Sequence, residues 1–317
     1  MKIVFMGTPD FAVPVLHTLV KDGYDVSLVV TQPDRPKGRK QVLTPPPVKV
    51  AAEALEIPVF QPEKIKNATE WMKVKEIDPD LIVTAAFGQI LPKELLNIPS
   101  KGCVNVHASL LPKYRGGAPI HQSVIDGEKE TGITIMYMVE KLDAGDIIAQ
   151  KAIPILQEDT AGTMHDKLSE LGAQLLQETI PLIEAGDIQA IAQDPQLVTF
   201  APNIKKEQEL IDWNKSATEI SNQVRGLNPW PVAFTLVEEK RFKIWGTYVY
   251  SISTNHEPGT VIELLDDAIL VACGKGTVLA LTNVQPSGKK PMDVSIFLRG
   301  AGSTWSSGMR LGKHDDE

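Results

Sequence analysis

An amide and an imidazole side chain stand two residues apart in a short apolar run, Val104-Asn105-Val106-His107. Successive side chains of a strand face opposite ways, so Asn105 and His107 would share one face while the two valines pack into the domain. At the carboxyl end of a strand, where open α/β sheets bind ligands, this pair can stabilise a carbonyl oxygen as it becomes an oxyanion, and the imidazole can move a proton. The pattern taken alone is equally compatible with two hydrogen-bonding residues that finish a strand.

Two carboxylates compete for the role of partner to the imidazole. The run Leu142-Asp143-Ala144-Gly145-Asp146 follows another predicted buried strand, and we therefore expect it at the same edge of the sheet. A carboxylate there orients an imidazole and stabilises its charged form, which completes an Asn-His-Asp site that needs no metal. Periodicity does not choose between Asp143 and Asp146, and each taken alone is typical of a residue that caps a loop.

The other histidines, the cysteines and the first glycine turn do not indicate a further site. The remaining histidines show no metal-ligand spacing, and two cysteines are too few for a disulfide framework, so we expect Cys103 and Cys273 to be small buried residues. Gly7 begins a strand-to-helix turn, but the Gly-x-Gly-x-x-Gly of a dinucleotide site is incomplete.

A second unusual stretch is basic. Residues 35–49 hold five basic residues, no acidic residue and three consecutive prolines. A stretch this polar and proline-rich is too long for a routine connection in a compact domain. It has two interpretations: a solvated insertion, or a flexible arm that meets a phosphate backbone and orders on contact.

The elements that must position these residues alternate along the first part of the chain. Continuous apolar runs predict strands, and residues at helical spacing predict helices between them. The predicted strands are residues 3–6, 26–30, 80–87, 102–108 and 132–139, and the predicted helices are residues 11–19, 48–56, 68–76 and 119–125. This alternation predicts a doubly wound, mostly parallel, Rossmann-like α/β sheet, closed by a longer helix at residues 162–184.

The pattern changes towards the end of the chain. We expect a catalytic domain at residues 1–188, a linker at residues 189–204 and a C-terminal domain at residues 205–317. Five predicted strands between residues 232 and 282, with a hairpin turn at 274–276, indicate a small OB-like β-barrel.

Composition excludes some classes of function. The net charge of −8 argues against a protein that coats nucleic acid indiscriminately, although it allows a local basic patch. The opening apolar run is too short for a signal peptide, and no later stretch reaches membrane length without charges. We therefore expect a protein of the reducing cytoplasm with no membrane partner.

The run from Asn105 to Ile120 resembles the signature of the folate-dependent formyltransferase superfamily. This resemblance implies 10-formyltetrahydrofolate as co-substrate, no metal, and catalytic roles for Asn105, His107 and Asp143, because the family's Leu-Asp-x-Gly falls on Asp143 and not on Asp146. It also implies that the reduced folate is bound by two stretches: Ser109, Leu110, Leu111 and Pro112, and Phe87, Gly88, Gln89, Ile90 and Leu91.

Three further stretches, at residues 7–12, 32–39 and 286–292, resemble the branch of this superfamily that formylates methionyl initiator tRNA. Ile296 stands where a polar residue is expected in that branch. The resemblance implies that the C-terminal domain binds tRNA and that the basic arm enters the acceptor arm. We expect the protein to be a monomer. The tRNA-binding residues on the arm would be Arg35, Lys37, Arg39 and Lys40.

Two alternatives stay open. One is the same chemistry on a small amine, such as glycinamide ribonucleotide or an aminosugar nucleotide, but neither acceptor explains a basic arm joined to a C-terminal barrel. The other is a folate-binding or RNA-binding protein without catalysis, which has no need for an oxyanion donor paired with an acid.

Overall fold

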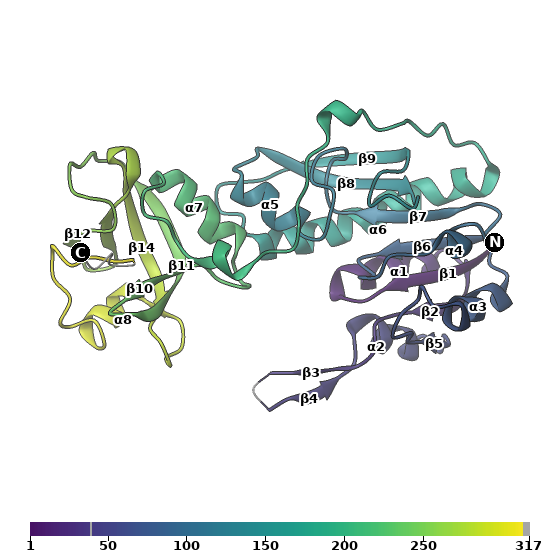
Figure 1. The fold of residues 1–317 in the computed structure, drawn as a ribbon, viewed down its shortest axis with the longest axis horizontal. Helices are drawn as coiled ribbons and strands as arrows, with labels where there is room; N and C mark the ends of the chain where they lie inside the picture. The colour runs from purple at the N-terminus through teal and green to yellow at the C-terminus, as the bar shows by residue number, and fades with distance from the viewer. Residues whose placement is uncertain (39, 313–317) are drawn as a thin grey trace. The chain divides into compact units, whose positions relative to one another are not determined.

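The computed structural model describes residues 1–38 and 40–312, which form two compact units (Figure 1). The first unit takes in residues 1–119, 130–154 and 165–202. The second takes in residues 120–129 and 155–164 and the chain from residue 203 onward. Residues 189–202, which we expected to lie in a linker, therefore group with the first unit.

The first unit is built on a seven-stranded sheet with the strand order β5-β2-β1-β6-β7-β8-β9. Its parallel part consists of β1 (Lys2–Gly7), β2 (Asp25–Val30), β5 (Val59–Phe60), β6 (Leu81–Ala85) and β7 (Cys103–His107). Two antiparallel strands, β8 (Glu130–Tyr137) and β9 (Ile147–Pro154), complete it. The predicted doubly wound, mostly parallel sheet is confirmed. The sequence pattern misses β9 because no residue of this edge strand is fully buried.

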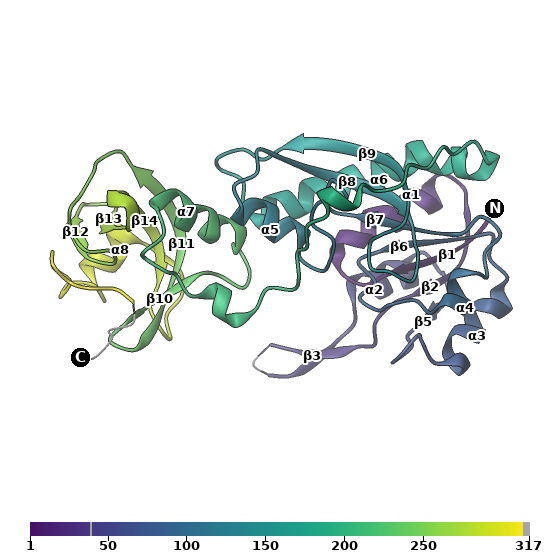
Figure 2. The ribbon, with the colours of Figure 1, turned by 45° about the horizontal axis from the view of Figure 1, so that its top comes forward.

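Helices pack on both faces of this sheet (Figures 1 and 2). They are α1 (Val13–Lys21), α2 (Pro47–Ala54), α3 (Ala68–Ile77), α4 (Lys93–Leu96) and α6 (Ala161–Ala185), with a short turn of helix, η1 (Asp10–Ala12), before α1. Among the described residues, no helix combines the length and apolar character that crossing a membrane requires.

The two faces of β7 have different partners. On one face α6 packs closely, since a Cβ on Gly172 would lie only 2.8 Å from Val106 Cγ1. On the other face Cys103 belongs to a core cluster with Val74 of α3 and Leu95 of α4. Because side chains alternate along a strand, residues 105 and 107 lie on the face of Cys103.

The basic stretch is more ordered than expected. Residues Arg35–Lys37 (β3) and Val42–Thr44 (β4) pair as an antiparallel hairpin, with Pro36 opposite Leu43. The hairpin stands away from the sheet of the first unit (Figure 1). The sequence suggests a flexible arm because it is polar and rich in proline, yet an isolated pair of edge strands tolerates proline where its missing N–H faces solvent.

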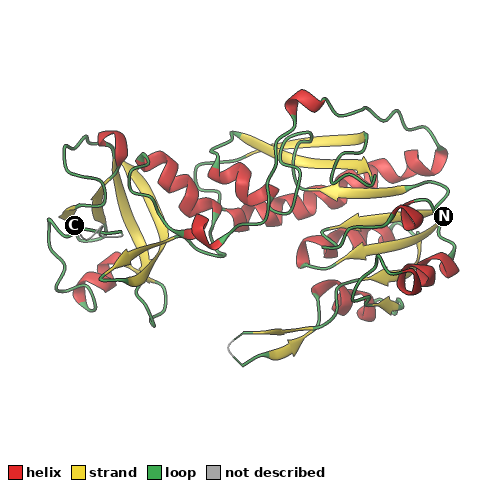
Figure 3. Cartoon of the chain, viewed as in Figure 1, coloured by secondary structure: helices red, strands yellow, loops and turns green. Residues whose placement is uncertain are grey.

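The second unit contains a six-stranded antiparallel sheet in the form of a half-barrel (Figure 3). Its strands are β10 (Phe234–Val237), β11 (Lys240–Tyr250), β12 (Val261–Leu264), β13 (Ile269–Ala272), β14 (Val278–Gln285) and β15 (Met292–Asp293). Its helices are α5 (Pro119–Ile125), α7 (Ala217–Gly226) and α8 (Val294–Arg299). The predicted turn at 274–276 joins the antiparallel strands β13 and β14, so it is confirmed.

Candidate active site

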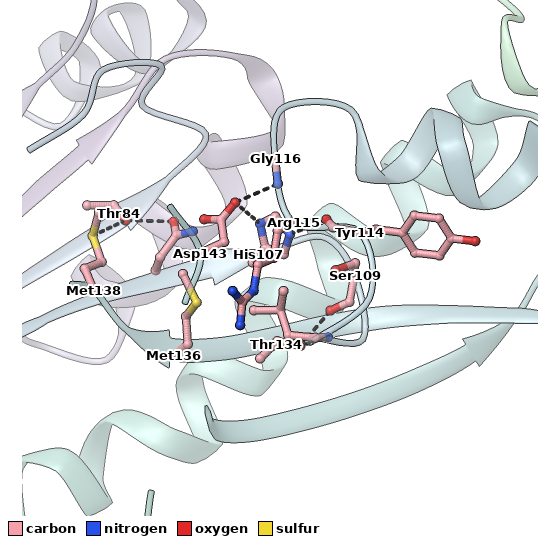
Figure 4. A network of polar contacts seen from close by, with 12 residues as sticks. Thr84, His107, Ser109, Tyr114, Arg115, Gly116, Thr134, Met136, Met138 and Asp143 are labelled. Carbon is pink, nitrogen blue, oxygen red and sulfur yellow. Dashed lines mark hydrogen bonds and ion pairs between the residues drawn. The ribbon is translucent and has the colours of Figure 1, made fainter. Parts of the chain in front are cut away.

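His107 ends β7 with its imidazole almost fully buried, at 7% exposure of the side chain. The ring nitrogen Nε2 lies 3.0 Å from the carbonyl oxygen of Tyr114. A carbonyl oxygen only accepts hydrogen bonds, so Nε2 carries a proton in this arrangement. The second ring nitrogen, Nδ1, lies 3.9 Å from Asp143 Oδ2 (Figure 4). Nδ1 is therefore the ring nitrogen that faces the carboxylate.

A backbone hydrogen bond holds Asp143 next to this imidazole. Its side chain is 10% exposed, and Oδ2 accepts a hydrogen bond of 2.8 Å from the backbone N–H of Gly116. Asp146, the competing carboxylate, is exposed, and its backbone oxygen accepts from the N–H of Tyr137. The structure thus brings Asp143 to His107 and leaves the Asp146 side chain on the surface.

The route by which Asp143 reaches His107 differs from the one we expected. We expected the end of a parallel strand, but β8 runs antiparallel to β7, and its last residue, Tyr137, pairs with Val104 instead of His107. The loop at 138–146 must therefore fold back along the sheet. Glycine is required at position 145, because a Cβ there would lie 1.8 Å from the carbonyl oxygen of Tyr137. Asp143 lies at the edge of the sheet where we expected it, but it does not reach this edge by following a parallel strand.

Asn105 shares the face of His107 at the same end of β7. Its Oδ1 lies 2.7 Å from Oγ1 of Thr84 on the neighbouring strand β6 and accepts a hydrogen bond from that hydroxyl. This contact turns the amide so that Nδ2, with its two N–H groups, is the part that can donate to a ligand. The site therefore combines a donor amide, an imidazole and a carboxylate.

The stretch that follows β7 is a tightly held loop. Thr134 of β8 donates through Oγ1 to the carbonyl oxygen of Ser109 at 2.6 Å and accepts from the N–H of Leu111 at 3.0 Å. Ser109 and Leu111 are buried, whereas Leu110 and Pro112 keep some exposed surface. The two partly exposed side chains are the ones that this loop can offer to a folate.

The second predicted folate stretch, Phe87–Leu91, follows β6. Because β6 and β7 are parallel neighbours, with Thr84 opposite Asn105, both stretches begin at adjacent strand ends. Phe87 and Leu91 are buried, Gly88 is exposed, and Ile90 is 73% exposed. Gln89 anchors the stretch by donating to the carbonyl oxygen of Pro62 at 3.0 Å.

The predicted tRNA contacts lie on the hairpin. Arg35, Lys37 and Lys40 are exposed, whereas Arg39 lies outside the described residues. Arg35 forms a surface ion pair of 2.8 Å with Glu63. Arg35, Lys37 and Lys40 thus form an exposed basic surface of the first unit.

Residues 191–201, the strap, have a role that no sequence pattern indicated: they hold the loop that carries Asp143 and the loop after β7. Gln193 donates through Nε2 to the carbonyl oxygens of Asp143 (2.9 Å) and Gly145 (2.8 Å), and its Oε1 accepts from Arg115. The backbone of Arg115 also pairs with residues 199–201. No local pattern marks this role, because a single Gln in a polar stretch is unremarkable until its distant partners are known.

The buried thiols take no part in this site. Burial raises the pKa of Cys103 to about 12 and that of Cys273 to about 12, so both thiols stay protonated. Among the described residues, no group of three or more His, Cys, Asp or Glu side chains has an arrangement that could hold a metal ion.

A donor amide, an imidazole and a largely buried carboxylate that meet at a strand end of an α/β sheet have the chemistry that acyl transfer requires. Comparison with known families is specific: residues 1–180 match the model of formyl transferase, and residues 203–302 match that of the formyl transferase C-terminal domain. The protein belongs to the formyl transferase family.

Relatives cover the whole chain. A protein of Halalkalibacterium halodurans named methionyl-tRNA formyltransferase is 62% identical over 315 residues, which is 99% of each chain. One of the same name in Bacillus subtilis is 60% identical over 300 residues, or 95% of each chain.

Solved structures share the fold at low identity. A sugar 3N-formyl transferase, WlaRD, crystallised in the presence of dTDP and 5-N-formyl-THF, has a TM-score of 0.67 at 20% identity and covers 92% of this chain and 99% of its own. HypX from Aquifex aeolicus in complex with tetrahydrofolic acid has a TM-score of 0.65 at 16% identity, over 99% of this chain and 51% of its own.

Proposed function

We propose that this protein transfers the formyl group of 10-formyltetrahydrofolate to the amino group of methionine on initiator tRNA, giving N-formylmethionyl-tRNA for translation initiation. The observation that carries this proposal is the meeting of Asn105, His107 and Asp143 at the end of β7, in a chain 62% identical to a relative named for the same reaction. The folate is a co-substrate, and its binding falls to the two loops after β6 and β7.

The chemistry is acyl transfer. The methionine amine attacks the formyl carbon, the carbonyl oxygen becomes an oxyanion, and N10 of the folate leaves with a proton that balances the one lost by the amine. Asn105 Nδ2 and the protonated Nδ1 of His107 donate to the oxyanion, which is often the largest single contribution to catalysis. Asp143 Oδ2, 3.9 Å from Nδ1, stabilises the imidazolium while the proton is in transit.

The acceptor is recognised by surfaces outside this site. We assign catalysis to residues 1–188 and tRNA binding to the hairpin and to the C-terminal domain at residues 205–317. The hairpin supports this assignment because it places the exposed cations Arg35, Lys37 and Lys40 beside the exposed apolar side chains of Val42 and Leu43. Cations bind the phosphate backbone, and apolar groups can contact bases. We further propose that the protein acts as a monomer in the cytoplasm, where both substrates are found.

One experiment tests the proposal directly. The protein is incubated with formyl-labelled 10-formyltetrahydrofolate and, separately, with methionyl initiator tRNA, glycinamide ribonucleotide and a dTDP-aminosugar, and the label in each acceptor is measured. We expect label in the methionyl-tRNA alone. Label in a small amine at a higher specificity constant than in methionyl-tRNA would contradict the proposed acceptor but keep the chemistry. Label in none of the three would contradict the transferase assignment.

A further inference from the structure

Gln193 occupies the junction between the two loops that carry the active site. Its amide fastens these loops through four hydrogen bonds: Nε2 donates to the carbonyl oxygens of Asp143 at 2.9 Å and of Gly145 at 2.8 Å, and Oε1 accepts from Arg115 Nε at 3.0 Å and Arg115 Nη2 at 2.7 Å. Nε2 also lies 4.0 Å from Met136 Sδ. Arginine can only donate and carbonyls can only accept, so the amide has one possible orientation. Only a primary amide satisfies both sides at once.

The residues around Gln193 fasten the same two loops. Ile191 exchanges two backbone hydrogen bonds of 2.8 Å with Ile147, directly after the Asp143 loop. Further along, the backbone of Arg115 donates to the carbonyl oxygen of Thr199 at 2.9 Å and accepts from the N–H of Ala201 at 2.8 Å. Residues 191–201, the strap, thus bind the Asp143 loop at one end and the loop after β7 at the other.

The loop after β7 supplies backbone groups that hydrogen-bond to His107 and Asp143. Tyr114 and Gly116 flank Arg115: the Tyr114 carbonyl oxygen accepts from His107 Nε2, and the Gly116 N–H donates to Asp143 Oδ2. Arg115 itself is 5% exposed, so its guanidinium is desolvated and depends on the Gln193 oxygen. A shift of the strap would therefore move the imidazole and the carboxylate relative to each other.

We propose that Gln193 is a positioning residue for formyl transfer, which acts by holding Asp143 against His107 and Gly116. This inference rests on the proposed function for its catalytic consequence, but the positioning itself can be measured without any substrate. A displacement of about 1 Å of a catalytic group can cost roughly a hundredfold in rate, so a single amide at this junction has a large effect on turnover.

Gln193→Glu is the sharpest test. The substitution keeps the length of the side chain and strengthens the contact with Arg115, which protects folding. It removes both donors and sets a carboxylate oxygen against the carbonyl oxygens of Asp143 and Gly145. Gln196→Glu is the matched control, because Gln196 is exposed in the same strap and its side chain has no hydrogen bond in the described residues.

The first readout is hydrogen exchange at the backbone amide of Gly116, followed by NMR. We expect exchange to quicken at least about tenfold in Gln193→Glu and to stay within about twofold of the wild type in Gln196→Glu, since loss of a stable hydrogen bond exposes the amide to solvent. Unchanged protection of Gly116 in Gln193→Glu overturns the inference, whatever reaction the protein performs.

The second readout is a double-mutant cycle that combines Gln193→Glu with Asp143→Asn. It measures kcat and KM with the acceptor that the wild-type protein formylates. We expect Gln193→Glu to lower kcat between about tenfold and a hundredfold with KM for the folate within about twofold, and to cost little more when Asp143 is already Asn, because both changes act through one carboxylate. Losses that multiply in the double variant contradict this mechanism of action. A wild type that formylates no acceptor contradicts the proposed function alone, and the exchange at Gly116 still decides the role of Gln193.

Discussion

Gly116 donates its backbone N–H to Oδ2 of Asp143 at 2.8 Å, although the two residues stand 27 positions apart in the chain. The same carboxylate oxygen faces His107 Nδ1 at 3.9 Å. A backbone N–H donor fixes the position of Asp143 and does not exchange a proton with its carboxylate.

Gly116→Ala should damage the site through the backbone. Gly116 has φ +123°, and a Cβ would lie 2.7 Å from the carbonyl oxygen of Ala201, so the loop must shift and its hydrogen bond to Asp143 must lengthen. We expect kcat to fall at least about tenfold and the free energy of unfolding to fall by about 1–3 kcal/mol. Gly186→Ala is the control, because it has a similar strain at φ +79° but meets no atom within 4 Å. Equal effects on kcat in the two variants would show that the loop position does not matter.

His107→Ala and Asn105→Ala should each nearly abolish formyl transfer while folate binding stays measurable. In the proposed mechanism both side chains donate to the oxyanion, and losing one such donor costs about 2.7–4 kcal/mol of the activation free energy. The check is single-turnover kinetics at saturating folate and tRNA, together with folate binding by fluorescence or calorimetry. Turnover above about a tenth of the wild type in either variant contradicts the assigned role.

Asp143→Asn should cost more activity than Asp146→Asn. The Asp143 side chain is only 10% exposed and lies beside His107, whereas the Asp146 side chain is exposed and its backbone oxygen accepts from the N–H of Tyr137. An amide in place of the Asp143 carboxylate no longer stabilises the imidazolium, so we expect a loss of about a hundredfold or more against less than about twofold for Asp146→Asn. Both variants are compared in kcat at saturating substrates. Equal losses of kcat in the two variants would mean that Asp146 is again a candidate for the catalytic carboxylate.

The basic hairpin can be tested by its salt dependence. Replacing Arg35, Lys37, Arg39 and Lys40 together by Ala should weaken tRNA use and leave folate binding nearly unchanged, because the hairpin is exposed and buries little core. Each lost phosphate contact should flatten the slope of log(kcat/KM) against log[salt] by about 0.7–0.9.

The matched control for this variant removes four exposed lysines in or beside α1 and α3: Lys21, Lys66, Lys73 and Lys75. It lowers the net charge by the same amount without touching the hairpin, so a long-range effect of charge would appear in both variants. We expect the control to keep the wild-type slope. The hairpin is not a tRNA contact if the hairpin variant has the same salt slope as the control variant and its kcat/KM for tRNA stays within a factor of two of the wild-type value.

Thiol reagents should leave the native enzyme active. Burial raises the pKa of Cys103 to about 12 and that of Cys273 to about 12, so at pH 8 almost no thiolate is present at either position, and access is blocked as well. We expect no labelling by iodoacetamide under native conditions and labelling of both cysteines in denaturant, followed by mass spectrometry. Rapid native labelling with loss of activity would show that one thiol is accessible near the site.

Much of the framework follows from local patterns in the sequence. Buried parallel strands consist of continuous apolar runs, so β1, β2, β6 and β7 are predictable from a few residues each. The shared face of Asn105 and His107 follows from the alternation of side chains along a strand, and the structure has both on the face of Cys103. The family signature adds Asp143, which neither periodicity nor spacing selects over Asp146.

The tertiary structure alone decided how these residues meet. Whether a strand runs parallel or antiparallel depends on its partner, so the return of the 138–146 loop past an antiparallel β8 has no local signal. The roles of Gly116 and Gln193 are likewise invisible in the sequence, because they consist of hydrogen bonds to residues 27 and 50 positions away. Such bonds form only after the chain has closed long loops around a core, so no local pattern in the sequence marks them.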